Sequence, residues 1–177
     1  MAAGVVSLSG TPTQNQTLAA NVTDVDGIPA GAPIAYQWQQ STNNGVTWTD
    51  IAGAATGSLS LQQAYVGRLV RAVVSYTDAA GNAEQDFSPA TASVGNVNDV
   101  GIATIAGTPV QGQTLTAGVT DLDGLANVAI TYRWQQLING TWSNIANATG
   151  VTYTLQAAQV GRQVRVRATY TDQLGGT

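Results

Sequence analysis

Apolar and polar residues alternate along most of the chain with a period of two. In residues 34–39, which read IAYQWQ, the side chains of Ile34, Tyr36 and Trp38 share one face. Residues 164–170, VRVRATY, alternate in the same way. Such alternation is typical of half-buried antiparallel strands, because successive side chains of a strand point to opposite faces. No segment shows the apolar stripe of a helix, so the sequence predicts an all-β protein.

Turn-forming residues divide these runs into short strands. Gly, Pro, Asn and Thr recur roughly every eight to twelve residues, which is the spacing of a small β-sandwich. In the first part of the chain the pattern predicts strands at 4–9, 16–23, 34–40, 46–51, 58–62, 68–77 and 84–94. A Trp in the third strand and a Tyr near the end of the sixth favour an Ig-like, Greek-key sandwich.

The chain carries this pattern twice. Residues 10–27 read GTPTQNQTLAANVTDVDG, and residues 107–124 read GTPVQGQTLTAGVTDLDG. Residues 66–78, VGRLVRAVVSYTD, likewise align with residues 160–172, VGRQVRVRATYTD. Length differences between the copies fall in predicted loops, where insertions are tolerated. We therefore predict two β-sandwiches in tandem.

The repeat sets the expected domain boundaries. We predict one domain at 1–95, a linker with the sequence NVND at 96–99, and a second domain at 100–177. The second copy contains no counterpart of residues 84–94, EQDFSPATASV. We therefore expect it to lack its last strand, as in a piece cut from a longer array, which leaves a strand edge exposed.

Composition excludes several classes of function. The chain has 177 residues, of which 44% are hydrophobic and 9% charged, a balance that suits a globular protein. It contains no Cys and no His, so the usual zinc ligands and the common nucleophile–base pairs are absent. A net charge of −4 argues against nucleic-acid binding. No run approaches the ~20 apolar residues of a membrane helix. We expect neither an enzyme, nor a nucleic-acid binder, nor membrane insertion.

Most of the ten acidic residues gather in corresponding loops of the two copies. In an Ig-like sandwich, the loops after the second and the sixth strand return to the end at which the chain enters. In the second copy, loops and linker should bring these oxygen ligands to that end: Asp121, Asp123, Asp172, Asn96, Asn98 and Asp99. The first copy repeats the loop part with Asp24, Asp26 and Asp78, preceded only by MAAG.

Such a concentration of carboxylates predicts a bound cation. Two unit charges ~4 Å apart repel by roughly 1 kcal/mol in water, and by more where water is partly excluded. Ca²⁺ accepts about six to eight oxygen ligands in flexible geometry, whereas Mg²⁺ requires a tighter octahedron. We therefore expect Ca²⁺ at the junction before the second copy, and less so at Asp24, Asp26 and Asp78, where linker ligands are missing.

Two alternatives remain open for these loops. Asp-Gly is a common turn dipeptide, in which Asp bonds to its own backbone, so DVDG and DLDG could be turns without an ion. Arg68, expected in a loop at the far end of the first domain, could instead neutralise Asp99 or Asp123 by a salt bridge worth ~0–1 kcal/mol if exposed.

The four Trp residues fall into two pairs. Trp38 and Trp134 lie on the inward face of their strands and are expected in the cores. Trp48 and Trp142 are expected to cover a sandwich edge. The alternative is that Trp48 and Trp142 stack on a sugar ring, which would make the chain a carbohydrate-binding accessory module.

Several motifs together point to a known kind of repeat. The ordered set GTPVQGQTLTA, DLDGL, YRWQQ, TYTLQAAQVGRQVRV and YTD, with the linker NVND, resembles the tandem Ig-like repeats of very large bacterial surface proteins. These are the type I-secreted, RTX-type adhesins and related hemolysin-type calcium-binding proteins. The resemblance covers almost the whole chain, although the glycine-rich nonapeptide repeats that give RTX proteins their name are not present in it.

The resemblance implies a location, a role and partners. It predicts an extracellular module at the bacterial cell surface, which extends the stalk of an adhesin and is stiffened by calcium. The expected partners are neighbouring repeats of the same chain, with host or matrix glycans contacted through other regions of the parent protein. No catalytic residues are implied.

Overall fold

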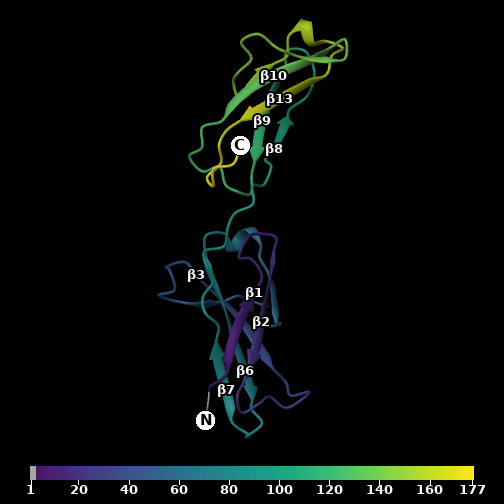
Figure 1. The fold of residues 1–177 in the computed structure, drawn as a ribbon. Coiled ribbons are helices and arrows are strands. Elements are labelled where there is room, and N and C mark those ends of the chain that lie inside the picture. Colours follow the sequence, from purple (N-terminus) through teal and green to yellow (C-terminus); the bar gives the residue numbers. More distant parts are fainter. Residues whose placement is uncertain (1–2) are drawn as a thin grey trace. The chain divides into compact units, whose positions relative to one another are not determined.

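The computed structural model describes residues 3–177, so Met1 and Ala2 of the expected first domain lie outside the described residues. The chain divides into two compact units, the first ending at Val97 and the second comprising Asn98–Thr177. Both are built from antiparallel strands (Figure 1). The predicted all-β class is confirmed.

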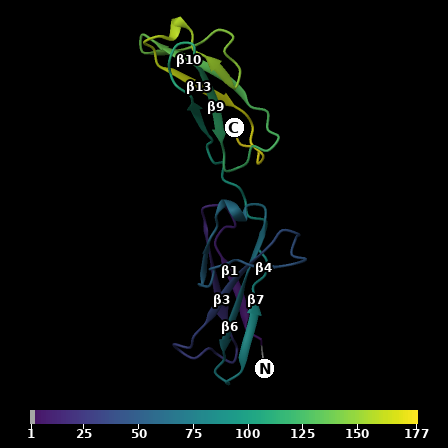
Figure 2. The same ribbon diagram turned by 180° about the vertical axis from the view of Figure 1, so that it is seen from behind.

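The first unit is a sandwich of two sheets. One sheet has the strand order β1-β2-β5 and the other β4-β3-β6-β7. Figure 2, seen from behind, shows β7 beside β6 at the edge of the second sheet. The strands are β1 (Val5–Ser9), β2 (Thr17–Thr23), β3 (Ala35–Ser41), β4 (Thr49–Asp50), β5 (Ser58–Ser60), β6 (Leu69–Thr77) and β7 (Ala83–Phe87), with a 3₁₀ turn η1 (Gln63–Tyr65) before β6.

The inward positions of the alternating pattern form the core. Trp38 is fully buried, and its indole N–H donates to the Thr56 carbonyl at 2.9 Å. Leu18 from β2 and Val70 and Val74 from β6 close around it with at most 1% exposure. Burial of a large indole with its polar atom satisfied is the arrangement that stabilises such cores.

The last strand of the first unit is shorter than predicted. The sequence predicted residues 84–94, but β7 ends at Phe87. Beyond it, backbone and side chains share the pairing with β6. The backbone N–H groups of Ser88 and Thr91 donate to the Ala72 and Val70 carbonyls, both at 2.9 Å. The Ser88 hydroxyl accepts the Ala72 N–H at 2.9 Å, and the Thr91 hydroxyl accepts the Val70 N–H at 3.0 Å. Pro89 lacks the backbone donor that a regular strand needs, so the segment stays paired without strand geometry.

The second unit repeats the sandwich with one strand fewer. Its sheets have the orders β8-β9-β12 and β11-β10-β13, and Trp134 is fully buried between them. The strands are β8 (Ile102–Ala106), β9 (Thr114–Thr120), β10 (Thr131–Ile138), β11 (Thr141–Asn144), β12 (Thr152–Thr154) and β13 (Val164–Thr169), with η2 (Ala157–Gln159) before β13. Within residues 3–177 no strand corresponds to β7 on the β13 edge. None of the described helices is long and apolar enough to cross a membrane.

Candidate metal centre in the second unit

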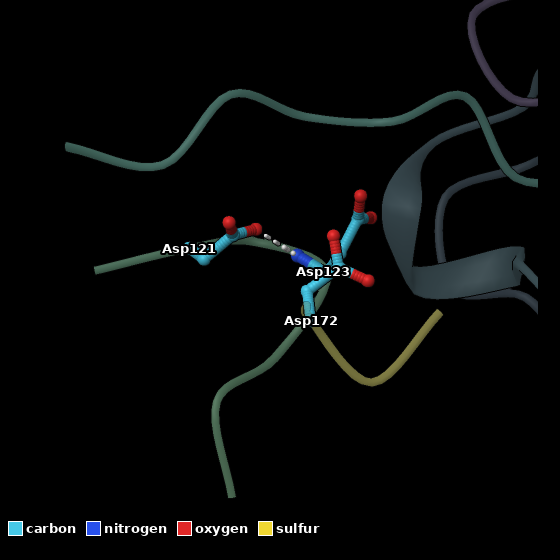
Figure 3. A group of neighbouring side chains, drawn as sticks. All are labelled: Asp121, Asp123 and Asp172. Carbon is cyan, nitrogen blue, oxygen red and sulfur yellow. Dashed lines mark hydrogen bonds between the residues drawn. The ribbon is translucent and has the colours of Figure 1, made fainter. Parts of the chain in front are cut away.

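Three aspartates from two loops meet at one end of the second unit. Asp121 and Asp123 lie in the loop that follows β9, and Asp172 lies just after β13 (Figure 3). One carboxylate oxygen from each lies within 4.8 Å of those of the other two. Asp123 is 3% and Asp172 6% exposed, so two of the three carboxylates are largely removed from water.

The DLDG loop holds its two aspartates by local hydrogen bonds. Asp121 Oδ1 accepts the Asp123 N–H at 2.9 Å, the bond drawn in Figure 3, which is the usual Asx turn. Gly124 then adopts a φ of +91°, a left-handed conformation that turns the chain after Asp123 and that favours glycine. The DLDG loop thus forms the turn that the sequence allowed as an alternative. The turn leaves the Asp121 and Asp123 carboxylates at the same end of the sandwich.

Asp172 organises the segment that follows β13. Its Oδ1 accepts the backbone N–H groups of Leu174 at 2.7 Å and Gly176 at 2.9 Å. Gly176 has no side chain, and a Cβ there would overlap both Asn98 Oδ1 and Asp172 Oδ2. The amide oxygen of Asn98 therefore lies beside the second carboxylate oxygen of Asp172, which adds a fourth oxygen to the cluster.

The linker residues reach this cluster in different ways. Asn98 contributes its side chain, whereas Asp99 contributes its backbone N–H, which donates to Asp123 Oδ2 at 2.8 Å. Asn96 belongs to the first unit, where its side-chain oxygen is buried without a hydrogen-bond partner. Arg68, the alternative partner expected from the sequence, donates to Gln40 Oε1 at 2.7 Å in the first unit.

Tyr170 lies beside the aspartate cluster and is not among the site residues expected from the sequence. Its hydroxyl donates to Asp121 Oδ2 at 2.6 Å. This hydrogen bond, together with burial and the negative charge around it, raises the pKa of Tyr170 to about 12. The repeated YTD motif was the available signal, because it places a Tyr two residues before the aspartate in both copies.

The first unit has the same Asx turn after its second strand, but its aspartates do not gather as Asp121, Asp123 and Asp172 do. Asp24 Oδ1 accepts the Asp26 N–H at 2.7 Å, and the Tyr76 hydroxyl donates to Asp24 Oδ2 at 2.6 Å. Asp78, however, accepts the backbone N–H of Asn82 at 2.6 Å and its side-chain N–H at 2.9 Å. Among the described residues only Asp121, Asp123 and Asp172 gather as a possible metal-binding group. The counterparts of Asn98 and Asp99 would be Met1 and Ala2, outside the described residues.

Glu84 and Asp86 enlarge the acidic group of the first unit. They pair across β6 with the buried residues Tyr76 and Val74, so their side chains share the inward face. The Tyr76 hydroxyl lies 3.1 Å from Asp86 Oδ2. Burial raises the pKa of Glu84, and the negative charges of Asp24, Asp86 and Asp78 raise it further. Period-two alternation on residues 83–87 was the signal that could have placed them inward.

The Asp78 loop predicts a pH dependence of stability. Its hydrogen bonds with the Asn82 side chain and backbone hold the pKa of Asp78 below its usual value of about 3.9. A lowered pKa in the folded state stabilises the protein above the unfolded pKa, and this contribution is lost as the pH falls through the folded pKa. We expect Asp78→Asn to lower the melting temperature at pH 7, and the difference from wild type to shrink below about pH 4.

Thermal unfolding of both proteins between pH 7 and pH 2 measures this difference. Asn82→Ala serves as the matched variant, because it removes the side-chain donor but keeps the Asp78 charge. Like Asp78→Asn, it should make the melting temperature change less between pH 7 and pH 2. A gap between Asp78→Asn and wild type that stays constant over the whole range would contradict the assignment.

The second pair of Trp residues is covered by arginine. The guanidinium carbon of Arg71 lies 4.4 Å from the Trp48 ring centroid and 4.6 Å from that of Phe87. Arg165 lies 4.4 Å from the Trp142 ring centroid. One face of each indole thus takes part in a cation–π contact within its own sandwich. This contact occupies one of the two faces on which a sugar could stack.

One protein-family model matches the chain, and the match lies within the first repeat. Residues 8–94 match the model of a family described as a domain of unknown function (DUF8696). No curated protein matches the chain. The matched range covers most of the first unit, from the last two residues of β1 through β7 to Val94, so it includes the segment after β7.

Proposed function

We propose that this chain is a structural repeat module of a bacterial surface adhesin, whose second unit binds Ca²⁺ through Asp121, Asp123 and Asp172. One observation carries the proposal: three carboxylates from two loops lie within 4.8 Å of one another, and two of them are buried. Negative charges this close repel each other, more strongly where water is excluded, and a divalent cation between them offsets the repulsion.

The donor set favours calcium among the common ions. The cluster offers oxygen atoms, and the chain contains no Cys or His that would select zinc or copper. Asn98 Oδ1 beside Asp172 supplies a neutral oxygen of the kind that Ca²⁺ accepts together with carboxylates. The loops can adjust to the six to eight ligands that Ca²⁺ takes, whereas Mg²⁺ would require a stricter octahedron.

The mechanical role follows from the residues that the ion would hold. Asn98 and Asp99 come directly after Val97, the last residue of the first unit, and both already contact the aspartate cluster. Bound calcium would fix this segment to the loops of the second unit and so restrain the connection between repeats. The resemblance to adhesin stalks supports an extracellular location with neighbouring repeats as partners, and the role involves no catalysis.

A calcium titration of the full chain tests the proposal. After treatment with EDTA, isothermal titration calorimetry should show one Ca²⁺ site, in the range of about 10⁻⁴–10⁻³ M that extracellular modules have. At 100 times the dissociation constant, the bound ion should stabilise the second unit by about 2.7 kcal/mol. Small-angle scattering with and without calcium then measures whether the connection between the repeats becomes stiffer.

Two matched variants locate the site. Asp123→Asn keeps an acceptor for the Asp99 N–H but removes a charge, so it should abolish calcium binding. Asp26→Asn makes the same change in the corresponding turn of the first unit and should leave the binding intact. Identical melting curves with and without 10 mM CaCl₂ would remove the calcium part of the proposal, and calcium binding without stiffening would remove the mechanical part.

A further inference from the structure

The outward face of one sheet in the second unit carries three exposed arginines. β10 and β13 lie side by side in this sheet (Figure 1), and Arg133 on β10 is the register partner of Arg167 on β13. Arg165 lies two residues before Arg167 and therefore on the same face. The second unit contains four acidic residues, none of them on β10, β11 or β13: Asp99, Asp121, Asp123 and Asp172. The strands of this sheet thus carry positive charge without a carboxylate of their own.

The first unit differs in charge at the corresponding positions. Three aligned pairs, one from each repeat, are involved: Gln37 and Arg133, Val73 and Arg167, and Asp50 and Asn144. Each difference makes the second unit more positive, and together they change the charge of the face by three unit charges. The positive face is therefore a property of the second repeat and does not follow from the shared fold.

Two arginines directly opposite each other are unfavourable in a sheet. In an antiparallel pair their Cβ atoms lie about 4.5–5.5 Å apart, where like charges destabilise the pairing. Within residues 3–177 no hydrogen bond or ion pair engages the guanidinium group of Arg133 or Arg167. An oxyanion between the two groups would offset the repulsion, because a guanidinium fork binds such an anion through two parallel N–H···O bonds.

The residue at the place of Arg133 in the first unit is not available in this way. Gln37 Nε2 donates to the backbone carbonyls of Trp38 and Ile51, both at 2.9 Å. Arg133 makes no such bond to the described residues, so its guanidinium is available to a ligand. The two repeats thus differ at this position in charge and also in how the side chain is used.

Arg133 and Arg167 border a hollow of about 650 Å³ on the same face. Seven of its nine lining residues are polar, and they include Thr131, Thr169 and Gln135. No lining residue follows Thr169, so the hollow lies over the face of β10 and β13 and not along the outer edge of β13. Its volume is within the range of about 300–1,000 Å³ that small-molecule sites have.

A ladder of side chains fixes one side of the hollow. Asn144 Oδ1 accepts an amide N–H of Gln135 at 2.8 Å, and Gln135 Oε1 accepts the Arg165 Nε–H at 2.7 Å. In the first unit the same ladder ends on a carboxylate, since Asp50 Oδ1 accepts an amide N–H of Gln39 at 2.8 Å. The amide of Asn144 preserves the hydrogen bond but removes a negative charge that would repel an anion.

We propose that this face binds an acidic saccharide, with a carboxylate or sulfate group held between Arg133 and Arg167. The saccharide class follows from the rest of the lining, because Thr hydroxyls and Gln and Asn amides both donate and accept hydrogen bonds, as sugar hydroxyls do. A long polyphosphate such as nucleic acid is disfavoured by the net charge of −4. The three aspartates of the calcium site do not line the hollow, so the proposal is independent of bound calcium.

Titration of the full, calcium-free chain with defined saccharides tests the proposal. Oligogalacturonate carries only carboxylates, sucrose octasulfate carries only sulfates, and maltotetraose is the neutral control. We expect saturable shifts of the Arg133 and Arg167 Nε–H signals in ¹⁵N NMR spectra with at least one acidic probe, and none with maltotetraose. The acidic probe that binds identifies the charged group. Binding should weaken several-fold between about 0.05 and about 0.5 M NaCl, because salt screens exposed charges.

Matched variants locate the site. Arg133→Gln introduces the residue that the first unit has at the same place, so the fold should persist, and binding should weaken about tenfold or more. Arg133→Lys keeps the charge but lacks the planar fork, so it should weaken binding less than Arg133→Gln does. Arg162→Gln removes the same charge from an exposed residue that does not line the hollow, and it should leave binding unchanged.

Four results would overturn the proposal. The first is the absence of saturable binding of both acidic probes at about 10 mM. The second is equal binding of maltotetraose. The third is an equal loss in Arg162→Gln and Arg133→Gln, which would reveal a general attraction of charge without a site. The fourth is tighter binding of inorganic polyphosphate than of either acidic saccharide, because the ligand would then be a phosphate chain.

Discussion

Replacing Trp38 with alanine is expected to lower the free energy of unfolding of the first unit by about 3–5 kcal/mol. The side chain is fully buried, and its removal leaves a cavity between the two sheets that the surrounding residues fill only in part. It also leaves the Thr56 carbonyl without the indole donor that lies 2.9 Å away. Urea unfolding followed by far-ultraviolet circular dichroism measures the loss.

Trp48→Ala is the matched control for this experiment. Trp48 is half-buried, and its indole N–H bonds to the nearby Gly45 carbonyl at 3.0 Å. Its removal exposes one face of Arg71 but creates no cavity between the sheets, so the loss should be clearly smaller. Equal losses for the two variants would show that Trp38 does not fill the core as described.

Replacing Asp172 with alanine is expected to lower the free energy of unfolding of the second unit by about 1–3 kcal/mol in the presence of EDTA. Asp172 is 6% exposed and accepts two backbone N–H groups, from Leu174 and Gly176. Without the carboxylate these donors lose a charged acceptor, and the segment after β13 loses its anchor. Because EDTA removes calcium, the loss reports the hydrogen bonds alone.

Asp172→Asn distinguishes the two roles of this residue. Asparagine keeps an oxygen at the same place, so in EDTA the variant should lose less stability than Asp172→Ala. With calcium both variants should lack the stabilisation seen in wild type, because each removes a charge from the proposed site. If Asp172→Asn and Asp172→Ala are equally unstable in EDTA, the backbone hydrogen bonds do not account for the loss.

The strands and the core were largely predictable because their signals are periodic. Alternation placed β2, β3 and β6 to within a residue or so of their observed bounds and assigned Trp38 and Trp134 to the cores. The predicted end of β7 was wrong, since the Ser88 and Thr91 hydroxyls replace backbone carbonyls as acceptors there, and this replacement leaves no trace in the apolar pattern. The cover of Trp48 also escaped prediction, because Arg71 reaches it from a distant strand.

The candidate site was predictable in its loops but not in its details. Topology alone brings Asp121, Asp123 and Asp172 to one end of the sandwich, and the structure gathers them. The sequence could not show that Asp99 contributes its backbone N–H. Nor could it show that Asn82 engages Asp78, because the direction of a short polar side chain in a turn depends on the folded backbone.

The tyrosine of the YTD motif gives both repeats the same resistance to alkali. Burial and the hydrogen bonds to Asp24 and Asp86 raise the pKa of Tyr76, and the bond to Asp121 raises that of Tyr170 to about 12. A raised pKa favours the folded state fully below the ordinary phenol pKa of about 10, and this advantage is lost only as the pH rises from there towards the folded value. The phenol therefore holds the loop after the second strand of each sandwich at neutral and mildly alkaline pH, and this hydrogen bond is lost only in strongly alkaline solution.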